Sequence, residues 1–307
     1  MRVFVTGASG HIGFPVVRDL LAAGHEVVGL ARSEASAERI AAAGAKVRQG
    51  SLDDLDGLRD AAKNADGVIH LAFKHDALVT GDFAGAVTAD LRAVEAIGDA
   101  LMGSEKPFVN TTGTMLLAHS VSGRAGTEND AGEAGGNPRV ASEDLSLAFA
   151  KRGVRTSIMR LAPTVHSSLD RHGFLPMLVA AARKLGFSAY VGEGSARWPA
   201  VHTLDAARLY RLALEAAPAG SRIHAAAEEG VPFRSIAEAI GRGLELPVKS
   251  VPADDAERIF GGFLGMITQL DNLTSSARTR EILGWKPTHA DLLADIAEGH
   301  YFASTSA

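Results

Sequence analysis

A glycine-rich segment near the start of the chain follows directly on a short apolar run. The segment reads TGASGHIG over residues 6–13, and the run before it covers residues 3–5. Three glycines at this spacing permit a tight strand-to-helix bend, close approach of the backbone to a pyrophosphate, and close packing of helix on strand. Phosphates then lie on the free N–H groups of the helix N-terminus. The segment therefore predicts a dinucleotide-binding loop.

The residues after this segment support that interpretation. Apolar residues recur at helical spacing until Gly24, and residues 26–30 form a second apolar run typical of a strand. The order strand, glycine loop, helix, strand favours a nucleotide-binding unit over a glycine-rich turn in another kind of α/β protein. The apolar positions of the predicted helix are Ile12, Val16, Val17, Leu20 and Leu21.

Length and charge limit the classes of function. The chain has 307 residues, enough for one large α/β domain or for a domain with a smaller lobe. Its 36 acidic and 31 basic residues give a net charge of −5 without long charged blocks, so no footprint for nucleic acid or an anionic membrane is present. We expect a small-molecule partner.

Cysteine content and hydropathy exclude further kinds of site and of segment. The sequence contains no cysteine, which excludes disulfides, thiolate nucleophiles and cysteine-ligated metals. The first strand begins at once, without a signal-like segment, and no apolar run is long enough to span a bilayer. These features predict a cytoplasmic protein without a membrane segment. No His-Glu-x-x-His pattern or aspartate-rich calcium loop occurs, so no metal site is expected.

The first half of the chain alternates between the two kinds of secondary structure. This alternation predicts an α/β fold, a Rossmann-type doubly wound parallel sheet with helices on both faces. Residues 113–136 contain six glycines and are interpreted as a loop beside the site. Asn137 and Pro138 indicate an N-cap and the first position of the following helix. The further predicted strands are 46–49, 67–71, 107–111 and 155–161, and the helices are 54–62, 82–102 and 138–151.

The second half is less regular. Helices are predicted over 174–185 and 203–217, the latter with Thr203 as N-cap, and strands over 189–194, 198–202 and 222–226. We therefore predict a Rossmann domain of residues 1–165 with 200–226, and a substrate-binding lobe of residues 166–199 with 227–307. Because ligands of such sheets bind beyond the carboxyl ends of the strands, the lobe is expected to close over that edge.

Four further segments appear in a familiar order. They are GSLDD at 50–54, VIHLA at 68–72, LAPTVH at 161–166 and LGWKP at 283–287. Together with the glycine loop they resemble the short-chain dehydrogenase/reductase superfamily, in its extended and atypical branches similar to NAD(P)-dependent epimerases and dehydratases. The resemblance implies that these segments line the adenine, the middle of the cofactor and the nicotinamide. The cofactor contacts it implies are Gly7, Ser9, Gly10, His11, Ile12, Gly13, Arg32, Ser33, Leu52, Asp53, Leu71, Ala72, Phe73, Thr111, Pro163 and Val165.

The end of the second strand indicates which dinucleotide binds. Ala31 stands where an acidic residue would hold the ribose 2′-hydroxyl of NAD, and Arg32 and Ser33 follow it. A guanidinium forms strong charge-assisted contacts with a 2′-phosphate. We therefore expect NADP(H) rather than NAD(H); the alternative is that Arg32 is a solvated loop charge.

The catalytic pair of the superfamily is missing. The resemblance implies a Tyr and, four residues later, a Lys on the helix after the fifth strand; Arg139 and Glu143 occupy these positions. Arginine cannot serve as a general acid or base, but its donors can polarise a carbonyl or clamp a carboxylate. Glu143 can accept hydrogen bonds from the cofactor ribose, but its charge would raise rather than lower the pKa of a neighbouring acid. An alternative is a simple helical i, i+4 ion pair. The tyrosines are Tyr190, Tyr210 and Tyr301, none followed four residues later by lysine, and Tyr210 is interpreted as a packing residue.

Other residues are candidates for the missing chemistry. The superfamily serine aligns with Gly113, flanked by the hydroxyls of Thr112 and Thr114. His166 follows the sixth strand, and its ordinary pKa suits proton transfer, so we consider it as general acid with a threonine holding the substrate oxygen. The alternative for His166 is a structural or substrate-binding role. His202 is considered as a residue of the substrate cleft, with positioning of the following helix as its alternative role.

Two functions remain open from the sequence. The first is an NADP-dependent oxidoreductase or epimerase/dehydratase-like enzyme of a small carbonyl, hydroxyl or sugar-derived substrate, with an unusual proton donor. The second is a catalytically silent NADP(H)-binding sensor or regulator. The resemblance also implies a possible homodimer through the helices at 82–102 and 138–151, although their alanines are equally suited to packing within one chain.

Overall fold

The computed structural model describes residues 1–75, 81–133, 135 and 137–303, and its centre is a parallel sheet. Seven strands lie in the order β10-β6-β5-β4-β1-β2-β3, and every pairing is parallel. The predicted Rossmann-type α/β fold is therefore confirmed. The strands are β1 (Arg2–Thr6), β2 (Glu26–Ala31), β3 (Lys46–Gln49), β4 (Gly67–His70), β5 (Pro107–Gly113), β6 (Arg155–Leu161) and β10 (Ser221–Ala225).

Helices cover both faces of this sheet. Side chains of β1 alternate between two buried clusters, with Val3 and Val5 in one and Phe4 in the other. The first cluster is completed by α1 (Gly13–Ala22), α2 (Glu34–Ala42) and α8 (Thr203–Ala216). The second is completed by α3 (Leu55–Lys63), α5 (Phe83–Leu101) and α6 (Val140–Ala150). Strands buried on both faces explain their continuous apolar sequence.

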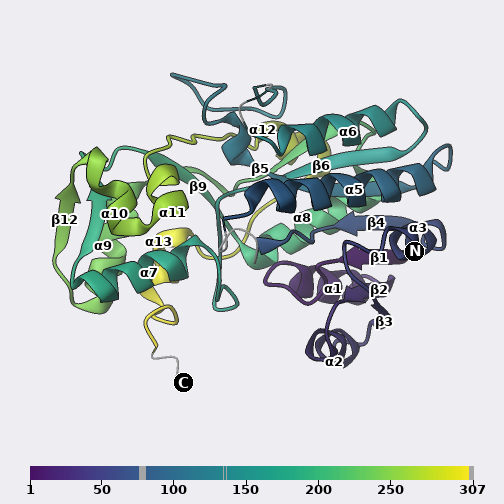
Figure 1. The fold of residues 1–307 in the computed structure, drawn as a ribbon, viewed down its shortest axis with the longest axis horizontal. Helices are drawn as coiled ribbons and strands as arrows, with labels where there is room; N and C mark the ends of the chain where they lie inside the picture. Colours follow the sequence, from purple (N-terminus) through teal and green to yellow (C-terminus); the bar gives the residue numbers. More distant parts are fainter. Residues whose placement is uncertain (76–80, 134, 136, 304–307) are drawn as a thin grey trace.

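A smaller lobe stands at the end of the molecule opposite α2 and β3 (Figure 1). It contains a three-stranded sheet in the order β11-β9-β7 and a two-stranded sheet of β12 and β8. The strands are β7 (Thr164–His166), β8 (Ser188–Val191), β9 (Arg197–His202), β11 (Glu228–Pro232) and β12 (Val248–Val251), and the helices are α7 (Phe174–Leu185), α9 (Phe233–Leu244), α10 (Ala256–Phe260), α11 (Gly262–Ile267) and α13 (Leu292–Ala297), with the 3-10 turn η2 at Ala253–Asp255.

Not all of the predicted lobe packs in the lobe. Helix α12 (Ala277–Leu283) leads to Trp285, and Leu283 and Trp285 join the cluster that holds β1 and α8. The indole Nε1 of Trp285 donates to the carbonyl of Asp205 at 3.1 Å. Residues around 283–285 are therefore part of the Rossmann core, and the remainder of the domain division stays a prediction. None of the helices in the described ranges is long and apolar enough to cross a membrane.

Two helix starts differ from the sequence prediction. Helix α6 begins at Val140 rather than 138, because the Asn137 side chain accepts from the backbone N–H of Arg139 in a turn before the helix. Helix α8 is capped by the ring of His202, which accepts from Leu204 N at 3.2 Å, so Thr203 is not the N-cap. Within the predicted loop 113–136, a 3-10 turn η1 (Thr114–Leu117) follows β5 directly, and residues 134 and 136 lie outside the described residues.

Candidate functional site

The glycine loop between β1 and α1 has no room for side chains. Gly7 has a φ of +68°, and a Cβ added there would lie 2.9 Å from Ala72 N. A Cβ on Gly13 would lie 2.0 Å from the carbonyl oxygen of Gly7, which itself accepts from Gly10 N at 3.0 Å. The loop is therefore a backbone cradle that only glycine permits at these positions.

The N-terminus of α1 has no side-chain cap and no acidic residue. Its N-cap, Ile12, makes no side-chain capping bond, and the first turn contains no carboxylate. The Phe14 N–H donates to the Gly10 carbonyl at 3.0 Å and Pro15 has no N–H, so the terminus attracts an anion chiefly through its partial positive charge. A cradle of glycines at such a terminus fits a dinucleotide pyrophosphate, and Ser9, Gly10 and His11 lie on the turn that leads into it.

Strand β2 ends beside this loop, because β1 and β2 are neighbours in the sheet. Arg32 and Ser33 follow Ala31 and are exposed. Ser33 caps α2, its hydroxyl accepting from Ser36 N at 3.3 Å. Farther along the same edge, Leu52 is buried and Asp53 is exposed, where it forms an ion pair with Lys74 at 2.7 Å.

A buried polar network fixes the ends of β1 and β4. The Thr6 hydroxyl accepts from the N–H groups of Leu71 and Ala72, each at 3.2 Å, and lies 2.8 Å from His70 Nδ1. His70 Nε2 lies 3.3 Å from Asp90 Oδ1 on α5. Burial alone would raise the pKa of Asp90, but the hydrogen bond with His70 holds that pKa below its ordinary range. The network, which sequence reasoning missed, sets the backbone that faces the glycine loop; its only signal was polar residues inside apolar strands.

Arg139 lies at the carboxyl end of β5. Its Nη2 donates to the Thr111 carbonyl at 2.7 Å, and its guanidinium carbon lies 4.4 Å from the centre of the Phe73 ring. Its Nε is buried without a hydrogen-bond partner. The Thr111 hydroxyl donates to the carbonyl of His70 at 2.6 Å and lies 2.8 Å from the hydroxyl of Tyr210. The structure thus brings Phe73, Thr111 and Arg139 together at the sheet edge. Their predicted roles toward the cofactor and the substrate stay predictions.

The chain is similar to one family model and to several known proteins. The family model described as NAD(P)H-binding matches residues 7–114. An uncharacterized protein of Schizosaccharomyces pombe is 49% identical over 98% of this chain and 100% of its own length. The 2′-dehydrokanamycin reductase of Streptomyces kanamyceticus is 28% identical over 83% of this chain and 70% of its own length. The dTDP-glucose 4,6-dehydratase DesIV of Streptomyces venezuelae, solved with NAD bound, has a similar fold, with a TM-score of 0.78, 19% identity, and coverage of 98% of this chain and 97% of that chain.

The chain belongs to one family with the uncharacterized protein of Schizosaccharomyces pombe, and its residues 7–114 form an NAD(P)H-binding region. Its fold is that of the dTDP-glucose 4,6-dehydratase. Helix α6, with the sequence VASEDLSLAFA, contains neither tyrosine nor lysine. The tyrosine and lysine that the sequence resemblance implies are therefore absent from this helix.

Glu143 lies on α6, and its carboxylate is bound by two arginine side chains. Arg160 Nε donates to its Oε2 at 2.9 Å, and Arg160 Nη2 and Arg222 Nε both donate to its Oε1. Burial alone would raise the pKa of Glu143, but Arg160 and Arg222 hold that pKa below its ordinary range. Both carboxylate oxygens are thus occupied, which disfavours the predicted contact with a cofactor ribose. The helical i, i+4 pair with Arg139 is not formed either, because the guanidinium of Arg139 binds Thr111 instead.

The two candidate threonines are enclosed. Thr112 is 2% exposed and its hydroxyl has no hydrogen-bond partner, while Thr114 is fully buried and donates to Asn272 Oδ1 at 2.7 Å. Neither hydroxyl faces an open surface. Their predicted role in holding a substrate oxygen stays a prediction that needs movement of these elements.

His166 is also enclosed. Its ring is fully buried, Nδ1 lies 3.0 Å from Asp295 Oδ2, and Nε2 has no partner. The ring packs edge-on against His202, which stacks on His289 with ring centres 4.6 Å apart. Such enclosure prevents direct proton transfer to a substrate in this arrangement, so its role as general acid stays a prediction. Nearby, Pro163 is half-buried and Val165 belongs to the Rossmann core.

Tyr210 has the predicted packing role. Its side chain is fully buried, and burial raises its pKa, although the hydrogen bond with Thr111 acts in the opposite direction. A phenol with a raised pKa in a closed site is a poor proton donor.

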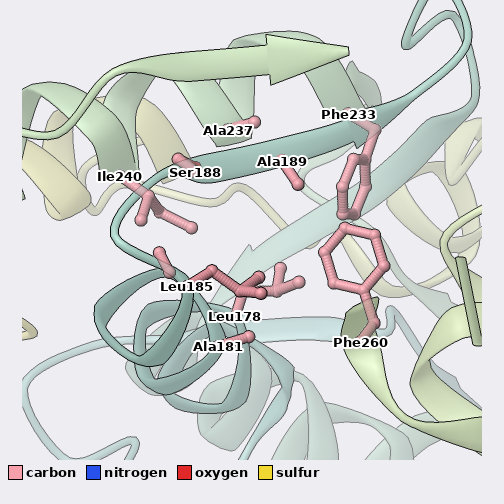
Figure 2. Close-up of a pocket in the computed structure, with 10 residues that line it drawn as sticks. Leu178, Ala181, Leu185, Ser188, Ala189, Phe233, Ala237, Ile240 and Phe260 are labelled. Carbon is pink, nitrogen blue, oxygen red and sulfur yellow. The ribbon is translucent and has the colours of Figure 1, made fainter. Parts of the chain in front are cut away.

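A small apolar cavity of about 10 Å³ lies inside the lobe, between α7, α9 and β8 (Figure 2). Its walls include Leu178, Leu185, Phe233, Ile240 and Phe260, with Ser188 as the polar lining residue. An apolar cavity of this size stays dry and is too small for a substrate. It is a packing gap away from the glycine loop.

Three potential metal ligands lie together at the end of α13. The ligand atoms of Asp295, Glu298 and His300 are within 4.8 Å of one another. Glu298 is 63% exposed, and Asp295 already faces His166. We assign no metal to this group, and the expectation of no metal site stays a prediction.

Proposed function

We propose that the chain is an NADP(H)-dependent oxidoreductase or epimerase-like enzyme that acts on a small carbonyl or sugar-derived compound. The observation that carries this proposal is the glycine cradle at the N-terminus of α1, where an added side chain on Gly13 would collide with the backbone of Gly7. The nicotinamide, when bound, supplies or accepts the hydride. One of the relatives is named a 2′-dehydrokanamycin reductase, and that name supports a reductase-type reaction here.

The preference for NADP(H) follows from the end of β2. Arg32 and Ser33 are exposed directly after Ala31, and no acidic side chain follows the strand before Glu34. A carboxylate at the end of β2 would favour the 2′-hydroxyl of NAD, whereas a guanidinium favours a 2′-phosphate. We therefore assign the 2′-phosphate contact to Arg32.

Arg139 is the residue we assign to the substrate carbonyl. It lies at the carboxyl end of β5, keeps its charge at any working pH, and holds a buried Nε without a partner. Fixed donors aimed at an oxygen that gains negative charge stabilise the transition state. Because arginine does not release a proton, the proton in this scheme comes from water rather than from Arg139.

A second function is favoured by the same helix. Arg139 and Glu143 stand where tyrosine and lysine carry the usual chemistry, which supports a chain that binds NADP(H) as a sensor without turnover. A screen of NADPH oxidation against ketones, aldehydes and oxidised sugars distinguishes the two. Turnover with any of these compounds supports the enzyme, whereas NADPH binding with no turnover across the screen supports the sensor.

We further propose that the chain forms a homodimer through the outer faces of α5 and α6. The inner alanines are not available for it, because Ala86, Ala89, Ala93 and Ala96 are buried within one chain, as is Gly98 against Phe149. Light scattering at several protein concentrations measures the oligomeric state. A monomer at high concentration would contradict the proposal.

A further inference from the structure

His11, in the glycine loop, contacts both the start of α8 and the smaller lobe. The Nε2 atom of His11 lies 2.9 Å from the hydroxyl oxygen of Thr203, and its Nδ1 lies 3.6 Å from Asp170 Oδ1. His11 and Asp170 are thus the contact between the cofactor cradle and the segment between β7 and α7.

The hydroxyl of Thr203 favours a proton on one nitrogen of His11. That hydroxyl lies 3.1 Å from the His166 carbonyl, to which it donates, and accepts from the Ser167 hydroxyl at 2.9 Å. With its single proton on the carbonyl, the hydroxyl accepts from His11, and this pattern favours the neutral ring that is protonated on Nε2. The lone pair of Nδ1 then faces a carboxylate oxygen, an arrangement that is favourable only when a proton lies on one of the two groups.

Asp170 is built to hold such a proton. Its side chain is 6% exposed, its Oδ1 accepts from Gly173 N at 2.8 Å, and its other neighbours include the hydroxyl of Tyr301. Burial raises the pKa of Asp170 to about 6, although the N–H groups of Gly173 and His172 act in the opposite direction.

His11 is surrounded by other titratable rings. Burial lowers its pKa to about 4, and the charges of His166, His172 and His202 act in the same direction. These rings come from β7, the segment before α7, and β9, whereas α8 presents the hydroxyl of Thr203 and the segment before α7 also presents Asp170. Above a pH of about 6, His11 and Asp170 together therefore carry one negative charge.

We propose that His11 and Asp170 hold one proton between them, and that the dinucleotide binds preferentially to the protein in which this proton is present. The reason is electrostatic. The pyrophosphate adds negative charge at the loop that contains His11, and an unprotonated pair opposes it with a like charge. Binding of the dinucleotide therefore takes up a proton, and its affinity falls as the pH rises above about 6. The inference rests on dinucleotide binding and not on turnover.

Calorimetry of the wild-type protein tests the proposal directly. NAD⁺ is the probe, because it lacks the 2′-phosphate whose own titration falls near pH 6. Titrations at pH 6.5 and 7.0 in two buffers of different ionisation enthalpy give the number of protons taken up. We expect a net uptake of roughly 0.2–0.5 proton per NAD⁺, the amount that accompanies a 3- to 10-fold difference in affinity between the two protonation states, and zero uptake would overturn the proposal.

The variant Asp170→Asn tests whether the proton that is taken up on binding lies on His11 and Asp170. We expect the variant to take up fewer protons, to match the wild type in NADP⁺ affinity at pH 5.5, and to bind NADP⁺ about 3- to 10-fold more tightly than the wild type at pH 8. The same cofactor is used for both proteins, so its own titration cancels. Equal pH dependence in the two proteins would overturn the proposal. Absence of turnover in every carbonyl screen would reject the proposed enzyme function. It would not contradict the proposal that His11 and Asp170 share a proton, which concerns dinucleotide binding.

Discussion

The carboxylate of Glu143 is held by the guanidinium of Arg160, whose Nε donates to Glu143 Oε2 over 2.9 Å, and both side chains are buried. Removing one partner of a buried pair leaves the other charge uncompensated, at a cost of about 3–5 kcal/mol. We expect Glu143→Leu to lower the free energy of unfolding by this amount, with little change in the NADPH affinity of the folded protein. Urea unfolding and fluorescence titration measure the two quantities.

The matched control removes both charges. Glu143→Leu combined with Arg160→Met is expected to be less destabilised than Glu143→Leu alone, because only the partly exposed guanidinium of Arg222 is then left without its carboxylate partner. If Glu143→Leu loses NADPH affinity while its unfolding is unchanged, Glu143 contacts the cofactor ribose as the sequence predicted.

Arg32→Ala tests the choice of dinucleotide. A charge-assisted hydrogen bond contributes about 1.5–3 kcal/mol, so the Kd for NADPH should rise roughly 10- to 150-fold while that for NADH stays the same. Lys46→Ala is the control. Lys46 is an exposed cation paired with Glu26, and it lies at the amino end of β3, away from the carboxyl ends of the strands. An equal effect of Arg32→Ala on both dinucleotides would show that Arg32 is only a surface charge.

Arg139→Ala tests the assigned substrate contact. Loss of a donor that stabilises charge in the transition state lowers kcat by about 10²- to 10³-fold. Arg139→Lys keeps the charge but loses the planar donors, so we expect an intermediate rate. Arg152→Ala, an exposed change just beyond the same helix, is the control. Steady-state kinetics with a substrate from the carbonyl screen decide the question, and unchanged kcat in Arg139→Ala would remove this residue from the reaction.

Gly13→Ala tests the backbone cradle. The new Cβ would lie 2.0 Å from the Gly7 carbonyl oxygen, so the loop must shift and dinucleotide binding should fall below detection. Gly24→Ala is a matched control, because Gly24 has a φ of +82° and no atom within 4 Å of an added Cβ. We expect that variant to lose only about 1–2 kcal/mol of stability and to keep its affinity. Cofactor binding by Gly13→Ala at wild-type strength would contradict the cradle.

Asp170→Asn also has a consequence for stability. The pKa of Asp170 is raised from 3.8 to about 6 in the folded protein, so the folded state holds a proton that the unfolded state releases. Stability from this group is present at low pH and is lost as the pH rises from about 4 to about 6, by up to about 3 kcal/mol. We expect the variant to gain stability relative to the wild type between pH 4 and pH 8, as measured by urea unfolding at each pH.

His11 contributes a pH dependence of the opposite sign. Its pKa is lowered from 6.5 to about 4, so the stability it supplies is present above pH 6.5 and is lost as the pH falls toward 4. Because His11 lies 3.6 Å from Asp170, the difference between wild type and Asp170→Asn reports the carboxyl group together with its coupling to His11. A difference that does not vary with pH would contradict the raised pKa.

Local pattern determined much of this protein. The glycine spacing after β1 required a backbone cradle, and the alternation of apolar strands with helical stripes determined the parallel sheet, because sterics and periodicity act over a few residues. The absence of tyrosine before Tyr190 likewise decided, without any structure, that α6 lacks the usual catalytic residue.

Only the tertiary structure decided which polar side chains meet. His11 faces Asp170, and Glu143 lies between Arg160 and Arg222, across separations that no spacing rule covers. Thr203 was wrongly predicted as a cap because its hydroxyl binds His11, Ser167 and the His166 carbonyl, which only the fold brings near it. Asn137 binds locally to Arg139 N, and the helix begins one residue after that turn, at Val140. The burial of His166 could not be predicted either, since burial depends on the packing of the whole lobe. The loop that binds the dinucleotide is encoded locally, whereas the charges around it are set by long-range packing.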